Sequence, residues 1–301
     1  MIDPTVIYSQ LRPRLEGIAY RMLGSMTEAE DIVQDVWLTW HGVDVATIDN
    51  PEAWLVTATT RRSIDRLRVL KQQREQYVGL WLPEPVLGPT PPTPEDVESV
   101  ADNASIAFLT VLETLTPEAR AAFLLREAFE QDYDAIGTII GKTSAACRQL
   151  VSRSKALLRE NAPWPAVPPA AHRDLLRRFA DTLERADFTA MLELLDEHAE
   201  FRADGGGKVP AFALLQGRDR VAQLFYAGHL RFGETMHSYP AIINGEQGLL
   251  RYVDGMLESA QAYVTDGRRI VRIYVQRNPD KLAAIVQKLG APPIVAPGAT
   301  S

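Results

Sequence analysis

The stretch ADGGGKVP, residues 203–210, places three glycines before a lysine, a combination that can surround phosphate groups. A phosphate-binding loop needs a glycine, four residues and then Gly-Lys-Ser/Thr, because its amides wrap the phosphates and its hydroxyl meets the magnesium ion. Here Arg202 stands where the first glycine should be, and Val209 stands where the hydroxyl should be. The loop therefore does not predict a nucleotide site, and its glycines need another explanation.

A second set of side chains could support acid–base chemistry in the C-terminal third of the chain. Its members are His229, His237, Tyr239, Tyr252 and Asp254. Aromatic and histidine residues at alternate strand positions are more often part of a core. We therefore expect no catalytic residue, no metal and no cofactor, with a small-molecule pocket that performs no chemistry as the alternative.

Composition restricts the class of protein. The chain has 301 residues, one cysteine (Cys147) and a net charge of −7, and it contains no run of about 18 apolar residues. We expect a cytoplasmic protein of several domains without a disulfide or a membrane span. The acidic balance argues against a general nucleic-acid binder. However, the excess acid is concentrated in residues 77–103, which hold five acids and no base.

That acidic segment is also rich in proline, as are residues 162–170. Proline removes backbone donors and disfavours helix in the residue before it. We interpret both segments as linkers, which predicts helical domains at 1–76 and 104–161 and a third domain at 171–301.

Two helices of opposite charge are predicted in the first domain. In SMTEAEDIVQDVWLTW, Thr27 is predicted as the N-cap with Glu30 completing a capping box, and apolar residues follow at helical spacing. Next, NPEAWLVTATTRRSIDRLR opens with Asn50 as a cap and Pro51 in the first turn. The basic residues of this second helix are Arg61, Arg62, Arg66, Arg68, Lys71 and Arg74.

The second domain has the spacing of a helix-turn-helix. Thr116 and Pro117 begin its first helix, and Gly137 and Gly141 allow a close crossing and a turn in the next pair. The apolar positions expected to lock that pair are Ile136, Ile140, Cys147 and Leu150. The last helix exposes Arg148, Gln149, Ser152, Arg153 and Lys155, and no acid occurs from Gly141 to Arg159. An ordinary antiparallel helix pair is the alternative interpretation.

The third domain begins with helical periodicity and changes to alternation after Met236. Asn244-Gly245 and Asp266-Gly267 are strong turn signals between the alternating runs. This order predicts an α+β domain in which helices cover one face of a curved antiparallel sheet.

Taken together, these segments resemble an extracytoplasmic-function (ECF) sigma factor of bacterial RNA polymerase over roughly residues 5–160. AEDIVQDVWLTW resembles the helix of sigma region 2 that docks on polymerase, and LTPEARAAFLLREAFEQDYDAIGTIIG resembles the start of region 4. The remainder resembles a SnoaL-like domain of the NTF2 superfamily. One subgroup of the family combines these parts with three signatures, which occur here as WLPEP (81–85), DGGGK (204–208) and NPDKL (278–282).

The resemblance implies an alternative sigma factor, a monomer when free, with core RNA polymerase and promoter DNA as partners. Asp31, Gln34 and Asp35 would dock on polymerase. The basic helix would grip the −10 promoter backbone, with the loop 43–50 capturing a flipped base. Arg148, Gln149, Ser152, Arg153 and Lys155 would face the −35 element, where Arg reads guanine and Gln reads adenine.

The resemblance further implies that the fused domain modulates activity, and we expect its DGGGK loop and NPDKL segment to contact either the linker or the sigma domains. The residues implied are Trp81, Pro83, Glu84, Asp204, Gly205, Gly206, Gly207, Lys208, Asn278 and Asp280. An ordinary hairpin loop is the simpler interpretation of DGGGK. For the whole chain, the alternatives are a helix-turn-helix regulator that binds a ligand and is not a sigma factor, and a SnoaL-like enzyme with a DNA-tethering arm.

Overall fold

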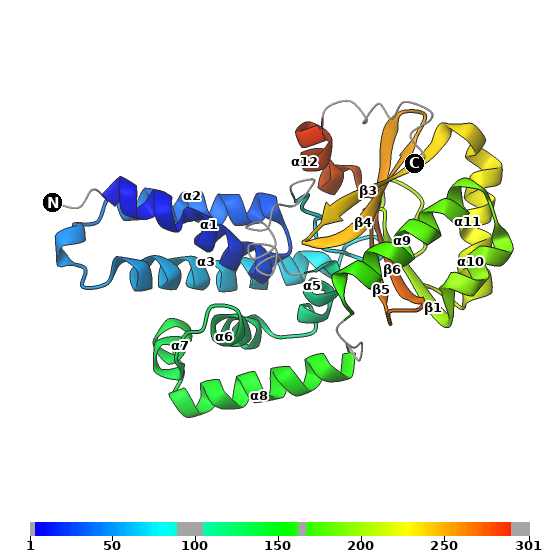
Figure 1. Ribbon diagram of the computed structural model, residues 1–301. Coiled ribbons are helices and arrows are strands. Elements are labelled where there is room, and N and C mark those ends of the chain that lie inside the picture. Colours follow the sequence, from blue (N-terminus) through cyan, green and yellow to red (C-terminus); the bar gives the residue numbers. More distant parts are fainter. Residues whose placement is uncertain (1–3, 89–104, 162–166, 290–301) are drawn as a thin grey trace. The chain divides into compact units, whose positions relative to one another are not determined.

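The computed structural model describes residues 4–88, 105–161 and 167–289 (Figure 1). The described chain forms two compact units. The helical unit contains residues 4–76 and 108–161, and the C-terminal unit contains residues 77–88, 105–107 and 167–289. Residues 77–88 thus group with the C-terminal domain. The rest of the first predicted linker, 89–103, and most of the second, 162–166, lie outside the described residues.

The first part of the helical unit packs three helices together. These are α1 (Pro4–Leu23), α2 (Met26–His41) and α3 (Pro51–Arg74), with a short 3-10 turn η1 (Val45–Thr47) before α3. Asn50 caps α3 as predicted, accepting a hydrogen bond from the amide of Ala53 at 3.0 Å. The predicted cap of α2 was wrong, because the cap is Ser25, two residues before Thr27, and its side chain accepts a hydrogen bond from the Glu28 amide.

The second part of the helical unit contains α5 (Ile106–Leu112) from Phe108 onward, followed by α6 (Pro117–Glu127), α7 (Tyr133–Ile140) and α8 (Ser144–Asn161). The α7–α8 pair forms the expected turn, and Gly141 has a φ of 68°. A Cβ on Gly137 would lie 2.5 Å from the Lys142 carbonyl oxygen, so only glycine permits this crossing. Ile136 and Cys147 are buried as expected, whereas Ile140 and Leu150 are only half-buried.

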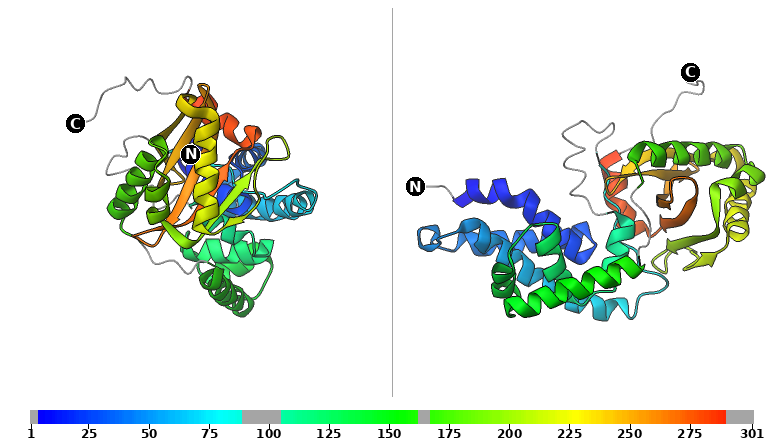
Figure 2. Two further views of the ribbon diagram at one scale, coloured as in Figure 1. Left: turned by 90° about the vertical axis from the view of Figure 1, so that its right-hand side faces the viewer. Right: turned by 60° about the horizontal axis from the view of Figure 1, so that its bottom comes forward.

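The C-terminal unit is built on one six-stranded sheet in the order β2-β1-β6-β5-β4-β3 (Figure 2). The strands are β1 (Leu195–Asp204), β2 (Leu215–Gln216), β3 (Met236–Ile243), β4 (Glu246–Val253), β5 (Met256–Thr265) and β6 (Ile270–Gln276). Strands β3 to β6 form the predicted antiparallel meander, and Asn244 and Gly245 both have positive φ in the β3–β4 turn. The sheet is mixed because β1 pairs with β6 in parallel.

Both faces of this sheet are covered. The helices α9 (Pro169–Glu184), α10 (Phe188–Leu194) and α11 (Arg218–Phe232) enclose one core, with the 3-10 turn η2 (Gly233–Thr235) leading from α11 to β3 (Figures 1 and 2). The opposite face carries a second core that includes Leu250, Tyr252 and Tyr274. Residues 80–87 and α12 (Pro279–Leu289) cover it. The prediction of one helix-covered face was therefore incomplete, because the apolar back of the sheet also needs a cover.

In the part of the chain that the structure describes, the helices are all too short or too polar to cross a membrane.

Candidate functional site

The Asp204 carboxylate, at the end of β1, joins the linker to the C-terminal domain. It is fully buried and accepts five donors. Oδ1 accepts from the Tyr77 hydroxyl at 2.6 Å and from the Gly206 amide at 2.9 Å. Oδ2 accepts from the Leu82 amide at 2.9 Å, from Gln276 Nε2 at 3.2 Å and from Lys281 Nζ at 2.6 Å. Two of the five donors belong to the linker, so this one carboxylate links segments more than 120 residues apart in the sequence.

Lys281 completes the charge balance at this point. Its ammonium also donates to the Leu82 carbonyl at 2.7 Å and lies 4.3 Å from the centre of the Trp81 ring and 5.0 Å from that of Tyr77. A cation over aromatic faces is attracted by their negative π-surfaces. The lysine therefore holds both the carboxylate and the aromatic side chains of the linker.

Two amide side chains next to β6 complete what we call the linker clamp, defined as Asp204, Gln276, Asn278 and Lys281. Gln276 Nε2 donates to the Leu82 and Pro83 carbonyls, both at 3.3 Å. Asn278 Nδ2 donates to the Tyr77 hydroxyl at 3.0 Å. Burial and the bond to Asp204 raise the pKa of Tyr77, so its hydroxyl stays protonated as a donor.

The end of the described linker segment, residues 86–88, is held by backbone pairing to the edge strand β3. Leu87 forms a bridge with Ile243, and the Gly88 amide donates to the Ile242 carbonyl at 3.0 Å. Asn244 accepts from the Val86 amide through Oδ1 at 3.0 Å and donates its own amide to the Val86 carbonyl at 2.8 Å. Between the two ends, Pro83 and Glu84 are buried. The docked linker protects a sheet edge that would otherwise have unpaired donors and acceptors.

The DGGGK loop lies against both other signatures. Gly206 has a φ of 63°, and a Cβ there would lie 2.4 Å from Nδ2 of Asn278. A Cβ on Gly207 would lie 3.0 Å from that of Val78 in the linker, and one on the buried Gly205 would lie 2.2 Å from the Val209 carbonyl oxygen. The three glycines of DGGGK are therefore explained by close packing, because a side chain at any of them would collide with a neighbouring group.

Lys208 and Asp280, by contrast, form an ion pair at 2.6 Å between two largely exposed side chains. Exposed pairs of this kind contribute little to stability.

The acidic residues of α2 form a continuous exposed stripe. Asp31, Gln34 and Asp35 are all exposed, while Ile32, Val33 and Val36 of the same helix are buried. Leu38 extends the stripe by one turn and is 65% exposed, which is unusual for a leucine. The surface therefore combines charge with one apolar side chain, as protein interfaces do.

The outer face of α8 presents the residues predicted to meet DNA. Arg148, Gln149, Ser152 and Arg153 are exposed, and the Arg148 guanidinium carbon lies 5.1 Å from the Tyr133 ring centre. Lys155 differs from them because it forms a 2.7 Å ion pair with Glu127 of α6.

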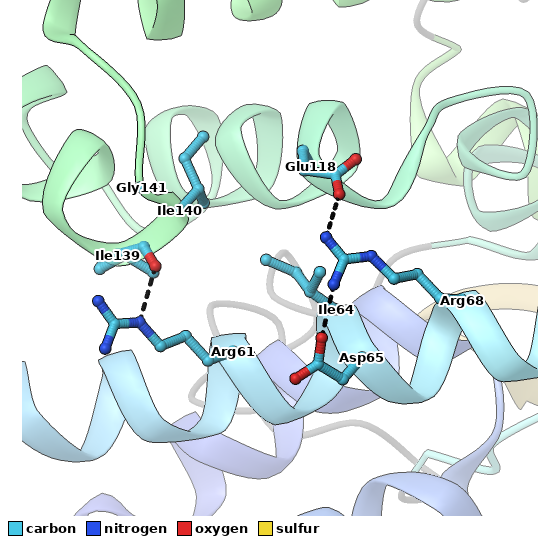
Figure 3. A pocket seen from close by; sticks show the side chains of 8 residues that line it. All are labelled: Arg61, Ile64, Asp65, Arg68, Glu118, Ile139, Ile140 and Gly141. Atoms are coloured by element: carbon cyan, nitrogen blue, oxygen red, sulfur yellow. Dashed lines mark hydrogen bonds and ion pairs between the residues drawn. The ribbon is translucent and has the colours of Figure 1, made fainter.

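The basic residues of α3 bond within the helical unit. Figure 3 shows Arg61 reaching from α3 to Ile139 of α7, and Arg68 reaching to Glu118 of α6. Arg61 donates to the Ile139 carbonyl at 2.9 Å and to the Thr138 carbonyl at 2.7 Å, while Arg68 pairs with Glu118. These groups line a cleft between α3 and α7 together with Ile64, Asp65, Ile140 and Gly141.

The remaining basic residues of α3 are bonded in the same way. Lys71 donates to the Leu115 carbonyl at 2.5 Å, and Arg74 pairs with Glu113. Arg62 donates to Thr39 Oγ1 at 2.7 Å, and Arg66 forms a two-point ion pair with Glu28. The six cations predicted to meet DNA therefore all have internal partners in this structure.

Three of the five candidate acid–base residues of the C-terminal domain come together, because His237 pairs with Tyr252 in the β3–β4 ladder and its ring centre lies 6.3 Å from that of Tyr239. Tyr239 packs beside Tyr252, with ring centres 5.5 Å apart, on the linker-covered face of the sheet. His229 lies on α11, and Asp254 lies in the β4–β5 turn with a φ of 51°. His229 and Asp254 therefore lie on other elements than His237, Tyr239 and Tyr252.

Sequence reasoning did not select three of the residues that hold the linker: Tyr77, Gln276 and Lys281. Lys281 lies inside NPDKL and Tyr77 begins the predicted linker, so proximity to a signature could have found both. For Gln276 the signal is weaker, since it is the polar end of an apolar strand.

Comparison with known proteins assigns both parts of the helical unit to sigma-factor families. Residues 7–74 match the family model of Sigma-70 region 2, and residues 105–158 match that of Sigma-70, region 4. The ECF RNA polymerase sigma factor SigJ of Mycobacterium tuberculosis is 34% identical over 287 residues, covering 91% of each chain. The probable ECF RNA polymerase sigma factor SigI of the same species is 28% identical, covering 93% of this chain and 94% of SigI. The crystal structure of M. tuberculosis SigJ matches with a TM-score of 0.76 and 31% identity, covering 93% of this chain and 98% of that one. The chain belongs to the ECF sigma factors of RNA polymerase.

Proposed function

We propose that this sigma factor docks on core RNA polymerase through the exposed α2 stripe of Asp31, Gln34, Asp35 and Leu38. The acids would steer encounter with a basic surface and set its register, and the exposed leucine would supply the apolar contact. No catalytic step is assigned to the chain, because nucleotide addition belongs to the polymerase.

The outer face of α8 would enter the major groove at the −35 element. Arg148, Gln149 and Arg153 are exposed there and carry the side chains that suit guanine, adenine and phosphate. Lys155 would contribute less, since its ion pair with Glu127 must first be broken.

Contact between α3 and the −10 element would require region 4 to leave α3. Arg61 and Arg68 already donate to region 4, so phosphate oxygens would have to replace the Thr138 and Ile139 carbonyls and Glu118. On polymerase this exchange is favoured because each released arginine gains a phosphate and the DNA releases counterions. The loop 43–50, which contains η1, remains the proposed site for a flipped base.

Regulation would act through the linker clamp. The observation that carries this proposal is the buried Asp204 carboxylate, which binds Tyr77 and Leu82 of the linker and Lys281 of the third signature. A buried charge bound to two separate segments is costly to build and is disrupted by a single change. We propose that docked and released linkers correspond to different transcriptional activities.

The test is transcription by sigma-free core polymerase supplied with the full-length protein. We expect promoter-dependent transcripts with the wild type, and slower association with core polymerase for the Asp31→Lys/Asp35→Lys double variant without loss of folding. Asp204→Asn should alter the transcript yield, and Asp280→Asn should leave it near the wild-type level. Equal yields from Asp204→Asn and wild type would exclude regulation through the clamp while leaving the docking proposal intact.

A further inference from the structure

Arg251, on β4, has two hydrogen-bond donors that nothing in the described chain satisfies. Its Nε and Nη2 atoms are shut off from solvent, and within the described residues neither a hydrogen-bond acceptor nor an acid pairs with them. The guanidinium carbon lies 5.0 Å from the centre of the Phe225 ring of α11. Unsatisfied buried donors of a charged group are expensive, so the site favours an acceptor from outside the chain.

The surroundings of Arg251 are polar although they face the helix-covered core. Arg251 pairs with Ser238 on β3 and with Ser259 on β5, which places the three side chains on one face. Ser259 and Gln261 are fully buried, and Gln261 donates to Ser259 Oγ at 3.0 Å while accepting from the Tyr263 hydroxyl at 2.5 Å. The hydroxyl and amide groups are thus bonded to one another, whereas the guanidinium is not.

A second guanidinium lies on the same side. Arg277 follows Gln276, which pairs with Ala260, so it comes beside Ser259. It forms an ion pair with Glu258 at 2.5 Å and donates to the Pro210 carbonyl, while its Nε is also buried without a hydrogen-bond partner. Two guanidinium groups and one carboxylate leave one net positive charge. Burial lowers the pKa of Arg251. Tyr263 and Glu258 act in the opposite direction and Arg277 adds to the lowering, so burial without a bonded acceptor is the main electrostatic cost that a bound anion would relieve.

We propose that Arg251, assisted by Arg277, binds the carboxylate of a small monocarboxylic ligand. Nε and Nη2 lie on one edge of the guanidinium and can donate two parallel hydrogen bonds, the geometry that a carboxylate accepts. A single negative charge balances the net positive charge of the cluster, and the Phe225 ring offers an apolar surface for the rest of the ligand. Phosphate would bring more charge than the cluster neutralises.

This site lies directly behind the linker clamp. Gln276 and Asn278 hold the linker on one face of the sheet, and Arg277 between them faces the other. The Arg277 amide donates to the Asp204 carbonyl at 2.8 Å. A bound ligand could therefore affect linker docking. That link to transcription rests on the proposed regulation, whereas the binding of the ligand to Arg251 does not.

The experiment uses the full-length protein labelled with ¹⁵N-arginine and titrated with sodium butyrate against sodium chloride at equal ionic strength and pH. We expect one Nε–H resonance to shift saturably and the unfolding temperature to rise with butyrate. Arg251→Lys keeps the charge but loses the two parallel donors, so it should remove that resonance and weaken butyrate binding at least about tenfold. Arg268→Lys, an exposed arginine of the same domain, is the matched control and should bind like wild type.

The wild-type titration is informative even if Arg251→Lys fails to fold. No saturable shift would mean that water satisfies the guanidinium, and equal affinity in a folded Arg251→Lys would place the ligand elsewhere. If inorganic phosphate shifted the same resonance at lower concentrations than butyrate does, the carboxylate assignment would be overturned. Butyrate binding that leaves transcription unchanged would remove only the link to regulation.

Discussion

Replacing Asp204 with Asn should release the first half of the linker from the C-terminal domain. The amide keeps an oxygen for Tyr77 and Gly206, but its NH₂ group would face three donors, from Leu82, Gln276 and Lys281. Lys281 would lose its counter-charge while its side chain is only 13% exposed. Breaking a buried ion pair from one side costs about 3–5 kcal/mol. We expect about 3 kcal/mol here, because Lys281 retains the Leu82 carbonyl as an acceptor.

Asp280→Asn is the matched control, since it removes a lysine partner from an exposed ion pair. Its cost should be about 0.2–1 kcal/mol. Hydrogen exchange of the Leu82 amide measures the opening free energy directly, because that amide donates to the Asp204 carboxylate. The Val86 amide, held by Asn244, should be affected less. If the two variants reduce Leu82 protection equally, the carboxylate does not hold the linker and the argument from burial is wrong.

Three further predictions follow from single side chains. Arg148→Ala should weaken promoter binding by the polymerase–sigma complex by about 1–3 kcal/mol, whereas Lys155→Ala should weaken it less because an ion pair already occupies that lysine; equal losses would contradict this. Gly206→Ala should reduce linker protection in hydrogen exchange more than Gly79→Ala, because both have positive φ but only the first Cβ meets another residue. Burial lowers the pKa of His172, so the unfolded chain binds a proton at this histidine at a higher pH than the folded chain does. The C-terminal domain should therefore lose stability as pH falls below about 6.5, as measured by thermal unfolding. His172→Gln should make the unfolding temperature depend less on pH.

Local signals predicted much of the helical unit. Asn50 and Thr116 cap their helices as expected, because a polar cap followed by proline leaves few other conformations. The start of α2 was predicted wrongly, because Ser25 with Glu28 and Thr27 with Glu30 are overlapping capping boxes and the pattern fits both. In the structure the Glu28 side chain forms an ion pair with Arg66 of α3.

The linker shows where local reasoning ends. Its prolines predicted an extended chain, and residues 81–86 are without helix or strand. Nothing local indicated that Tyr77 would bond to Asp204, because no periodicity connects residues so far apart in the sequence. The need to cover a second apolar face became visible only once Leu250 and Tyr252 were placed opposite the helices. The internal partners of Arg61 and Arg68 could not be predicted from the sequence either, because these partners are distant in the sequence and meet the arginines only through tertiary packing.

If the clamp regulates transcription, the physical agent is the sheet face rather than the length of the connection between the sigma regions. The connection from Arg74, at the end of α3, to Ile106, at the start of α5, is about 30 residues long. Doubling the length of a flexible loop changes its closure free energy by only about 0.6 kcal/mol. Release of the linker, however, would uncover the buried Leu82 together with the apolar sheet face beneath it. An exposed apolar patch is a binding surface, so Leu82→Ser should reproduce the transcriptional effect of Asp204→Asn even with the carboxylate intact. Normal transcription by a Leu82→Ser variant whose linker is released would instead favour a tether mechanism.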